Sequence, residues 1–247
     1  MAEREIVVCR DIAELSGQSA ERFSQLTRQS VQGSGRFTVA LSGGSTPTHL
    51  YSRLSSADYK DRVPWNNVHL FWGDERCVPP DHPESNFGMV HRALLSKIKI
   101  PAGNSHRMAG EREPQAAAAD YEKELQRFFG LESGASPRFD LILLGIGEDG
   151  HTASLFPGSD ALNETEHPVV APFVEKLNSY RLTLTLPVLN HGAEVWFLVT
   201  GASKAAALKE ILSGSSDLPA AKVQPVDGKL TWFVTRDAAV GVPAADR

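Results

Sequence analysis

The chain has 247 residues, of which 41% are hydrophobic and 22% are charged. This balance supports a packed core and excludes a disordered protein. The formal net charge is −5 and no basic run is interleaved with aromatic residues, so we expect no nucleic-acid partner. No apolar run is long enough to span a membrane, so we expect no membrane association.

The two cysteines, Cys9 and Cys77, lie far apart in the sequence and form no CxxC motif. Together with the lack of a signal peptide, this pattern favours free thiols and a cytoplasmic location. His82, His91 and His106 do not have the spacing of metal ligands, so we expect no metal site.

The chain alternates predicted strands with predicted helices from one end to the other. Strands are expected at residues 5–9, 37–41, 68–72, 141–144, 169–174, 181–186, 194–200 and 230–234. Helices are expected at residues 12–31, 47–54, 86–97, 115–130, 204–212 and 236–240. This order predicts a three-layer, Rossmann-like α/β sandwich with a mostly parallel sheet, in one domain over residues 1–247. A small subdomain within residues 150–195 is compatible with the pattern.

A glycine-rich turn follows the second predicted strand. Gly43 and Gly44 permit a close backbone approach, Ser45 and Thr46 supply hydroxyl groups, and the next helix begins at Pro47 with Thr46 as its N-cap. A helix N-terminus offers free N–H groups and a positive dipole end, so this turn is a candidate phosphate site. No Walker motif follows, so ATP chemistry is not implied. A well-capped turn without a ligand is the alternative.

Three charged residues, Asp74, Glu75 and Arg76, follow the third predicted strand. Ligands bind at the carboxyl ends of the strands in open α/β sheets, so Asp74 and Arg76 are candidate site residues. A structural ion pair is the alternative.

The turn at residues 145–151 follows the most apolar predicted strand, and its sequence is GIGEDGH. It matches the dinucleotide fingerprint GxGxxG, but Glu148 and Asp149 would repel a diphosphate. A solvated turn between strand and helix is a second interpretation. We favour a third, in which His151 and Asp149 belong to a catalytic loop, because histidine titrates near neutral pH.

Lys204 stands in the first turn of the helix predicted at residues 204–212. A positive charge there opposes the helix dipole, which indicates a nearby anion. A solvated lysine is the alternative.

Six segments, in this order along the chain, resemble the 6-phosphogluconolactonase family. They are residues 41–47 (LSGGSTP), 73–88 (GDERCVPPDHPESNFG), 143–158 (LLGIGEDGHTASLFPG), 181–190 (RLTLTLPVLN), 201–212 (GASKAAALKEIL) and 223–234 (VQPVDGKLTWFV). The resemblance implies the fold shared by glucosamine-6-phosphate deaminase and ribose-5-phosphate isomerase. It also implies a cytosolic enzyme of the oxidative pentose phosphate pathway that needs no metal or organic cofactor.

Two relatives of this family are alternatives. The deaminase carries a carboxylate shortly after its DGH motif, in a segment that ends NEPG, whereas residues 154–158 (SLFPG) have no glutamate. This difference favours hydrolysis over isomerisation. Non-enzymatic sugar-phosphate-binding domains of transcription regulators follow a helix-turn-helix, for which a sheet beginning near Glu5 leaves no room.

The resemblance implies 6-phospho-D-glucono-1,5-lactone as the substrate, opened by water to 6-phosphogluconate. His151 is the expected general base and Asp149 its orienting partner, while Arg76, positioned by Asp74, stabilises the oxyanion or binds sugar hydroxyls. The expected phosphate site comprises Gly43, Gly44, Ser45 and Thr46, with Arg181 and Lys204 as its cations.

No GxSxG motif is present, so we expect direct attack by water. We expect a monomer or weak homo-oligomer.

Overall fold

The structure is a computed structural model that describes residues 3–132 and 135–242. Its main sheet has seven strands in the order β1-β11-β10-β6-β2-β3-β5, and every neighbouring pair is parallel. The strands are β1 (Glu3–Cys9), β2 (Phe37–Leu41), β3 (Val68–Trp72), β5 (Ser105–His106), β6 (Leu141–Leu144), β10 (Glu194–Val199) and β11 (Lys229–Thr235). The predicted α/β class and parallel sheet are confirmed.

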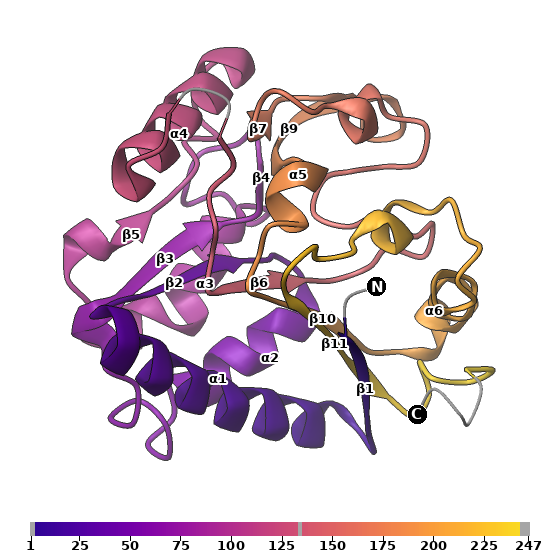
Figure 1. Cartoon of the computed structure of the whole chain (residues 1–247), viewed down its shortest axis with the longest axis horizontal. Coiled ribbons are helices and arrows are strands. Elements are labelled where there is room, and N and C mark those ends of the chain that lie inside the picture. Colours follow the sequence, from indigo (N-terminus) through magenta and orange to yellow (C-terminus); the bar gives the residue numbers. More distant parts are fainter. Residues whose placement is uncertain (1–2, 133–134, 243–247) are drawn as a thin grey trace.

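Helices cover both faces of this sheet. They are α1 (Ile12–Ser34), α2 (Ser45–Leu54), α3 (Asn86–Ala93), α4 (Pro114–Phe129), α5 (Leu186–Leu189) and α6 (Ala205–Leu212). Figure 1 shows α1 and α2 together on one side of the sheet and α4 on the other. Every residue of β2 and of β6 is buried, as expected for strands covered on both faces.

A second, antiparallel sheet begins where the chain leaves β3. Its strands are β4 (Asp74–Arg76), β7 (Val169–Val170), β8 (Phe173–Val174) and β9 (Ser179–Leu184). β4 and β7 lie on either side of β9, and β8 pairs with the first residues of β9. In Figure 1 this sheet lies beside α4, above the main sheet. It joins β4, which directly follows β3, to strands that come after β6 in the chain.

Some predicted elements differ from the structure. The strand predicted at residues 169–174 is two short strands, β7 and β8, separated by Ala171 and Pro172. Proline lacks the N–H that would continue a ladder. The helix predicted at 86–97 ends at Ala93, and a 3-10 turn follows at Leu95–Lys97. Residues 236–240 form turns and not the predicted helix.

The start of α2 also differs from the prediction. The helix begins at Ser45, and Gly44, with φ 102°, is its N-cap. The predicted N-cap, Thr46, lies inside the helix, and its hydroxyl is 2.7 Å from the Thr200 hydroxyl after β10. α6 likewise begins one residue later than predicted, with Lys204 in the N-cap position. Among the described residues, no helix has the length and apolar character needed to cross a bilayer.

Candidate active site

A cavity of about 250 Å³ opens at the carboxyl edge of the main sheet. The loops that follow β2, β6 and β10 line it, because these three strands are neighbours at the centre of the sheet. β4 and the start of α3 complete the wall. The cavity gathers these predicted site residues: Gly43, Gly44, Ser45, Thr46, Asp74, Arg76, His151 and Lys204. The other two, Asp149 and Arg181, do not line it.

His151 and Asp149 form a hydrogen-bonded pair at the end of β6. The Nδ1 atom of His151 lies 2.5 Å from Oδ1 of Asp149, and the backbone N–H of His151 donates to the same oxygen at 3.2 Å. Because the carboxylate accepts the proton on Nδ1, Nε2 is the nitrogen that can take a proton from a bound water. His151 faces the cavity and Asp149 supports it from behind.

Gly147 makes room for this pair. A Cβ atom at this position would lie 2.0 Å from Nδ1 of His151 and 2.5 Å from Oδ1 of Asp149. The Gly147 N–H also donates to the His151 carbonyl at 2.8 Å, which closes the turn. Gly150, with φ 74°, supplies the left-handed residue within it. The glycines of this motif therefore shape a turn that holds an acid against an imidazole.

Asp149 is held in its ionised form by two cationic or proton-donating neighbours. Burial raises the pKa of its carboxyl group, but hydrogen bonds from Lys176 and His151 outweigh burial and hold the pKa well below its usual range. The side chain of Asp149 is 34% exposed, so the pair lies at the boundary between protein and solvent. An ionised Asp149 favours a proton on Nδ1 of His151.

Asp74 is buried at the floor of the cavity and is fixed through both carboxylate oxygens. Asn86 Nδ2 donates to Oδ1 at 3.1 Å, and Ser154 Oγ donates to Oδ2 at 2.8 Å. Gly43 allows Asn86 to reach this position, since a Cβ atom on Gly43 would lie 1.8 Å from Asn86 Oδ1. These contacts hold the Asp74 carboxylate in a single orientation at the cavity.

Glu75 has a structural role. It is 2% exposed and accepts hydrogen bonds from the backbone N–H groups of Asn86 at 2.7 Å and Phe87 at 2.8 Å, at the N-terminus of α3. Burial raises its pKa, and these hydrogen bonds oppose that rise. Its carboxyl group therefore anchors α3 and is directed away from the cavity.

Arg76 and Arg181 lie opposite each other on β4 and β9, but only Arg76 lines the cavity. Arg76 Nη1 donates to the Glu84 carbonyl at 2.6 Å, whereas Arg181 Nη1 donates to Ser179 Oγ at 2.9 Å and the Tyr180 carbonyl at 3.0 Å. Burial lowers the pKa of Arg181, and the neighbouring positive charge of Arg76 lowers it further. The structure thus places Arg181 near the site without bringing it to the turn at Gly43–Thr46.

The turn after β2 presents an uncapped helix N-terminus to the cavity. In the described chain, no side chain caps α2, so its first N–H groups remain available to a ligand. Lys204, at the start of α6, lines the same cavity and forms a 3.7 Å ion pair with the largely exposed Glu148. An exposed pair of this length is weak, and a dianion at α2 could replace Glu148 as the partner of Lys204.

Several residues of the site were not found from the sequence. Ser42 lines the cavity, and its Oγ is buried without a hydrogen-bond partner among the described residues. Asn86 and Thr200 also line it. Lys176, which pairs with Asp149, comes from a hairpin 25 residues farther along the chain than His151. Ser42 directly precedes the glycine turn, so it could have been predicted from the sequence. Asn86, Thr200 and Lys176 reach the site only through tertiary packing.

No group of three or more His, Cys, Asp or Glu side chains within residues 3–132 and 135–242 is arranged to hold a metal ion. Both cysteines are free, and Cys9 is buried.

Comparison with known proteins identifies relatives over nearly the whole chain. Residues 10–232 match the family described as glucosamine-6-phosphate isomerases/6-phosphogluconolactonase. A 6-phosphogluconolactonase of Nostoc sp. is 39% identical over 243 residues, which cover 97% of this chain and 98% of the relative. A 6-phosphogluconolactonase of Synechocystis sp. is 45% identical over 208 residues, which cover 83% of this chain and 84% of the relative.

Solved structures of related proteins also superpose on nearly the whole chain. The 6-phosphogluconolactonase of Trypanosoma brucei superposes with a TM-score of 0.87 at 27% identity, covering 98% of this chain and all of that one. The 6-phosphogluconolactonase of Thermotoga maritima has a TM-score of 0.83 at 32% identity, and the superposition covers 95% of this chain and all of that one. A monomeric glucosamine-6-phosphate deaminase has a TM-score of 0.81 at 20% identity, over 96% of this chain and 99% of the deaminase, which shows a shared fold alone.

The substitution Gly147→Ala should break the hydrogen bond between Asp149 and His151, because the new methyl group would overlap both side chains. Gly147 does not have a left-handed φ, so alanine adds no backbone strain there. Gly17→Ala is the matched control, since no atom lies within 4 Å of its added Cβ. Crystal structures of both variants provide the measurement. Retention of the 2.5 Å contact in Gly147→Ala would show that the turn is not shaped by this glycine.

Proposed function

The chain belongs to the glucosamine-6-phosphate isomerase/6-phosphogluconolactonase family, and we propose that it hydrolyses 6-phospho-D-glucono-1,5-lactone to 6-phospho-D-gluconate. This is the activity named for its relatives, and it is a step of the oxidative pentose phosphate pathway. The observation that carries the proposal is the cavity that His151, hydrogen-bonded to Asp149 behind it, shares with an uncapped helix N-terminus and a lysine. Such a cavity suits a substrate with a reactive carbonyl at one end and a phosphate at the other.

Residues 154–158 favour hydrolysis over isomerisation within this family. Ser154 donates to Asp74, and the ring of Phe156 packs against the His151 imidazole with 4.3 Å between centroids. The segment thus places a hydroxyl and an apolar ring beside the dyad and contributes no carboxylate. Opening and isomerising an amino sugar would call for an additional proton donor or acceptor at this place.

In the proposed mechanism, His151 is the general base. Its Nε2 takes a proton from a water molecule as the water oxygen attacks C1 of the lactone, which gives a tetrahedral intermediate. The C1–O5 bond then breaks, and the imidazolium returns the proton to O5, so that 6-phosphogluconate leaves as an open chain. Asp149 holds the proton on Nδ1 and stabilises the imidazolium between the two transfers. No serine or cysteine nucleophile is required.

Arg76 is the proposed partner of the developing oxyanion. Its guanidinium belongs to the wall of the cavity, on the strand that also carries the buried Asp74. A fixed positive charge in a confined site stabilises a developing negative charge without reorganising solvent. Asp74 was expected to position Arg76, and that role stays a prediction. Because its carboxylate is held by Asn86 and Ser154, we propose in addition that it binds sugar hydroxyls and limits the orientations open to the substrate.

The phosphate is proposed to bind at the turn Gly43–Thr46 and Lys204. The free N–H groups of the first turn of α2 and the positive end of its dipole suit a dianion, and Lys204 adds a positive charge that lines the same cavity. Arg181 stays a prediction for this role, since it would have to exchange its bonds to Ser179 and Tyr180 for the phosphate.

We further propose that the enzyme works in the cytoplasm on this small-molecule substrate, as a monomer or weak homo-oligomer and without a nucleic-acid partner. The two free cysteines and the net charge of −5 support this view. The proposed chemistry moves one proton through His151 and needs no metal or organic cofactor.

The reaction class can be tested directly. Purified protein should accelerate the opening of 6-phosphogluconolactone above its spontaneous rate and release no ammonia from glucosamine 6-phosphate. Acid release followed in a weakly buffered solution, with the spontaneous rate subtracted, provides the first measurement, and an ammonia assay provides the second. Ammonia release at a comparable rate would instead assign the isomerase activity.

The proposed division of roles between His151 and Lys204 gives a second test. His151→Ala should lower kcat by about 10²-fold or more, because a general base acts in the transition state. Lys204→Ala should mainly raise KM, by the equivalent of about 1.5–3 kcal/mol for one charge-assisted contact. Steady-state kinetics on the lactone provide the measurement, and Lys209→Ala, an exposed lysine of the same helix, is the control.

The effect of Lys204→Ala should shrink on a lactone that lacks the phosphate, since the lost contact is then absent from both enzymes. Near-normal kcat in His151→Ala, together with loss of kcat at saturating substrate in Lys204→Ala, would contradict this division. Asp74 would then be the next candidate for the base.

A further inference from the structure

We propose that Lys176 is a positioning residue for the His151–Asp149 pair: it anchors Asp149 from the β8–β9 hairpin and sets the pH at which His151 becomes available as a base. The inference rests on the proposed hydrolysis. Lys176 lies in the 3-10 turn Glu175–Leu177, at the tip of that hairpin. It reaches the dyad from the side opposite the substrate cavity.

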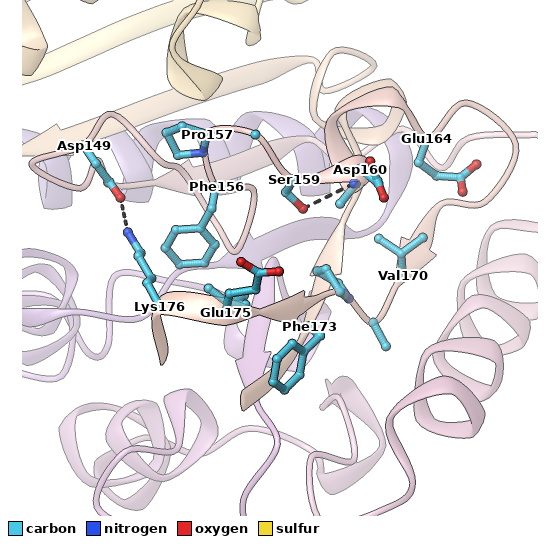
Figure 2. Close-up of a pocket in the computed structure, with 15 residues that line it drawn as sticks. Asp149, Phe156, Pro157, Ser159, Asp160, Glu164, Val170, Phe173, Glu175 and Lys176 are labelled. Carbon is cyan, nitrogen blue, oxygen red and sulfur yellow. Dashed lines mark hydrogen bonds and ion pairs between the residues drawn. The ribbon is translucent and has the colours of Figure 1, made fainter. Parts of the chain in front are cut away.

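The two oxygens of Asp149 have separate partners. Oδ1 accepts the proton of His151 Nδ1 at 2.5 Å, and Oδ2 forms an ion pair with Lys176 Nζ. Figure 2 shows this ion pair as the dashed contact between the two side chains. Because a carboxylate bound through both oxygens cannot rotate freely, Lys176 fixes the plane in which Asp149 meets the imidazole.

Lys176 also contacts His151 indirectly, through the ring of Phe156. Lys176 Nζ lies 4.4 Å from the centroid of the Phe156 ring, and that ring packs against the His151 imidazole with 4.3 Å between centroids. Phe156 is buried, whereas the side chain of Lys176 is 49% exposed, so the ring lies between the lysine and the imidazole on the protein side. A cation held on an aromatic ring and paired with a carboxylate has two partners that restrict its position.

A second cavity, of about 750 Å³, lies on the far side of Asp149 and explains why an anchor is needed there. Residues 156–161 and 170–176 supply most of its wall. Asp160, Glu164 and Glu175 line it, and Lys176 is the only cationic side chain among its described lining residues. Figure 2 shows these groups around the opening. Without Lys176, Asp149 would face an open, acidic cavity with one oxygen unpaired.

The hairpin also ties the dyad to the other half of the active site. β9, which leaves the hairpin, pairs with β4, so that Thr183 lies opposite Asp74 and Arg181 opposite Arg76. One continuous segment therefore contacts the back of the dyad through Lys176 and supports the strand that carries Asp74 and Arg76. The hairpin and β9 thus link the support of Asp149 to β4, the strand that carries Asp74 and Arg76 in the cavity wall.

The charge of Lys176 should affect the protonation of His151. The described charged groups around His151 are Asp149 and Lys176 behind the imidazole, Asp74, Arg76 and Lys204 in the cavity that it lines, and Glu148, which pairs with Lys204. Replacing Lys176 with a neutral residue removes one positive charge and leaves the carboxylate of Asp149 less neutralised. The imidazolium is then favoured, so the base is protonated up to a higher pH.

The test compares K176M, which removes the charge, K176R, which keeps it, and K97M, an exposed lysine of another 3-10 turn. K176M should lower kcat about ten-fold, the rate equivalent of one charge-assisted hydrogen bond, with KM nearly unchanged. In a plot of kcat against pH, the rise on the acidic side (the acid limb), where His151 loses its proton, should move to higher pH in K176M. K176R should restore most of kcat and the position of that limb, and K97M should match the wild type.

A second readout does not depend on turnover. The NMR titration curve of the His151 ring should move to higher pH in K176M and stay in place in K97M. An unmoved titration curve and acid limb in K176M would overturn the inference, even if kcat fell, because a merely structural role predicts that result. Absence of lactone hydrolysis by the wild type would refute the proposed function alone, since the titration still decides the role of Lys176.

Discussion

The hydrogen bond between Asp149 and His151 is the interaction on which the rest of the site depends. The two residues are separated by a single glycine, so the bond forms only if the chain turns sharply at the end of β6. Gly147 leaves the space that the imidazole and the carboxylate occupy, and Gly150 supplies the left-handed backbone. The glycines of a sequence that matches a dinucleotide fingerprint therefore shape a turn in which Asp149 orients the His151 imidazole.

The sheet order determines what this turn faces. β6 lies between β2 and β10, so the loop bearing His151 lines the same cavity as the uncapped start of α2 and Lys204. In the proposed mechanism, the loops of the main sheet provide the phosphate site and the base, and β4 of the small antiparallel sheet provides Asp74 and Arg76 for the sugar. Placing the reactive and the anchoring contacts on different loops of a rigid sheet allows binding of a remote phosphate to position the carbon that reacts.

Local patterns in the sequence predicted most of the fold, and eight of the ten candidate site residues line one cavity. Buried strands ending in glycine turns placed His151, Lys204 and residues 43–46 at one edge, because parallel strands align their carboxyl ends. Two of the predicted strands, at residues 169–174 and 181–186, correspond to β7, β8 and β9 of the second sheet. The short strand β4 and its pairing with β9 were not predicted, because this pairing joins residues about 100 positions apart. For the same reason the sequence could not show that Arg181 would lie beside Arg76 and outside the cavity, or that Lys176 would reach Asp149. Thr46 was misassigned as a cap because Gly44, with its positive φ, ends the turn earlier.

The most direct test of this account is a crystal structure of the protein with its product, 6-phosphogluconate. The account predicts the phosphate on the backbone N–H groups of residues 43–46 and on Lys204, and the C1 carboxylate within hydrogen-bonding distance of His151 Nε2 and Arg76. A product bound in the reverse direction, or with C1 beyond the reach of His151, would contradict the assignment of His151 as the base and of the α2 turn as the phosphate site.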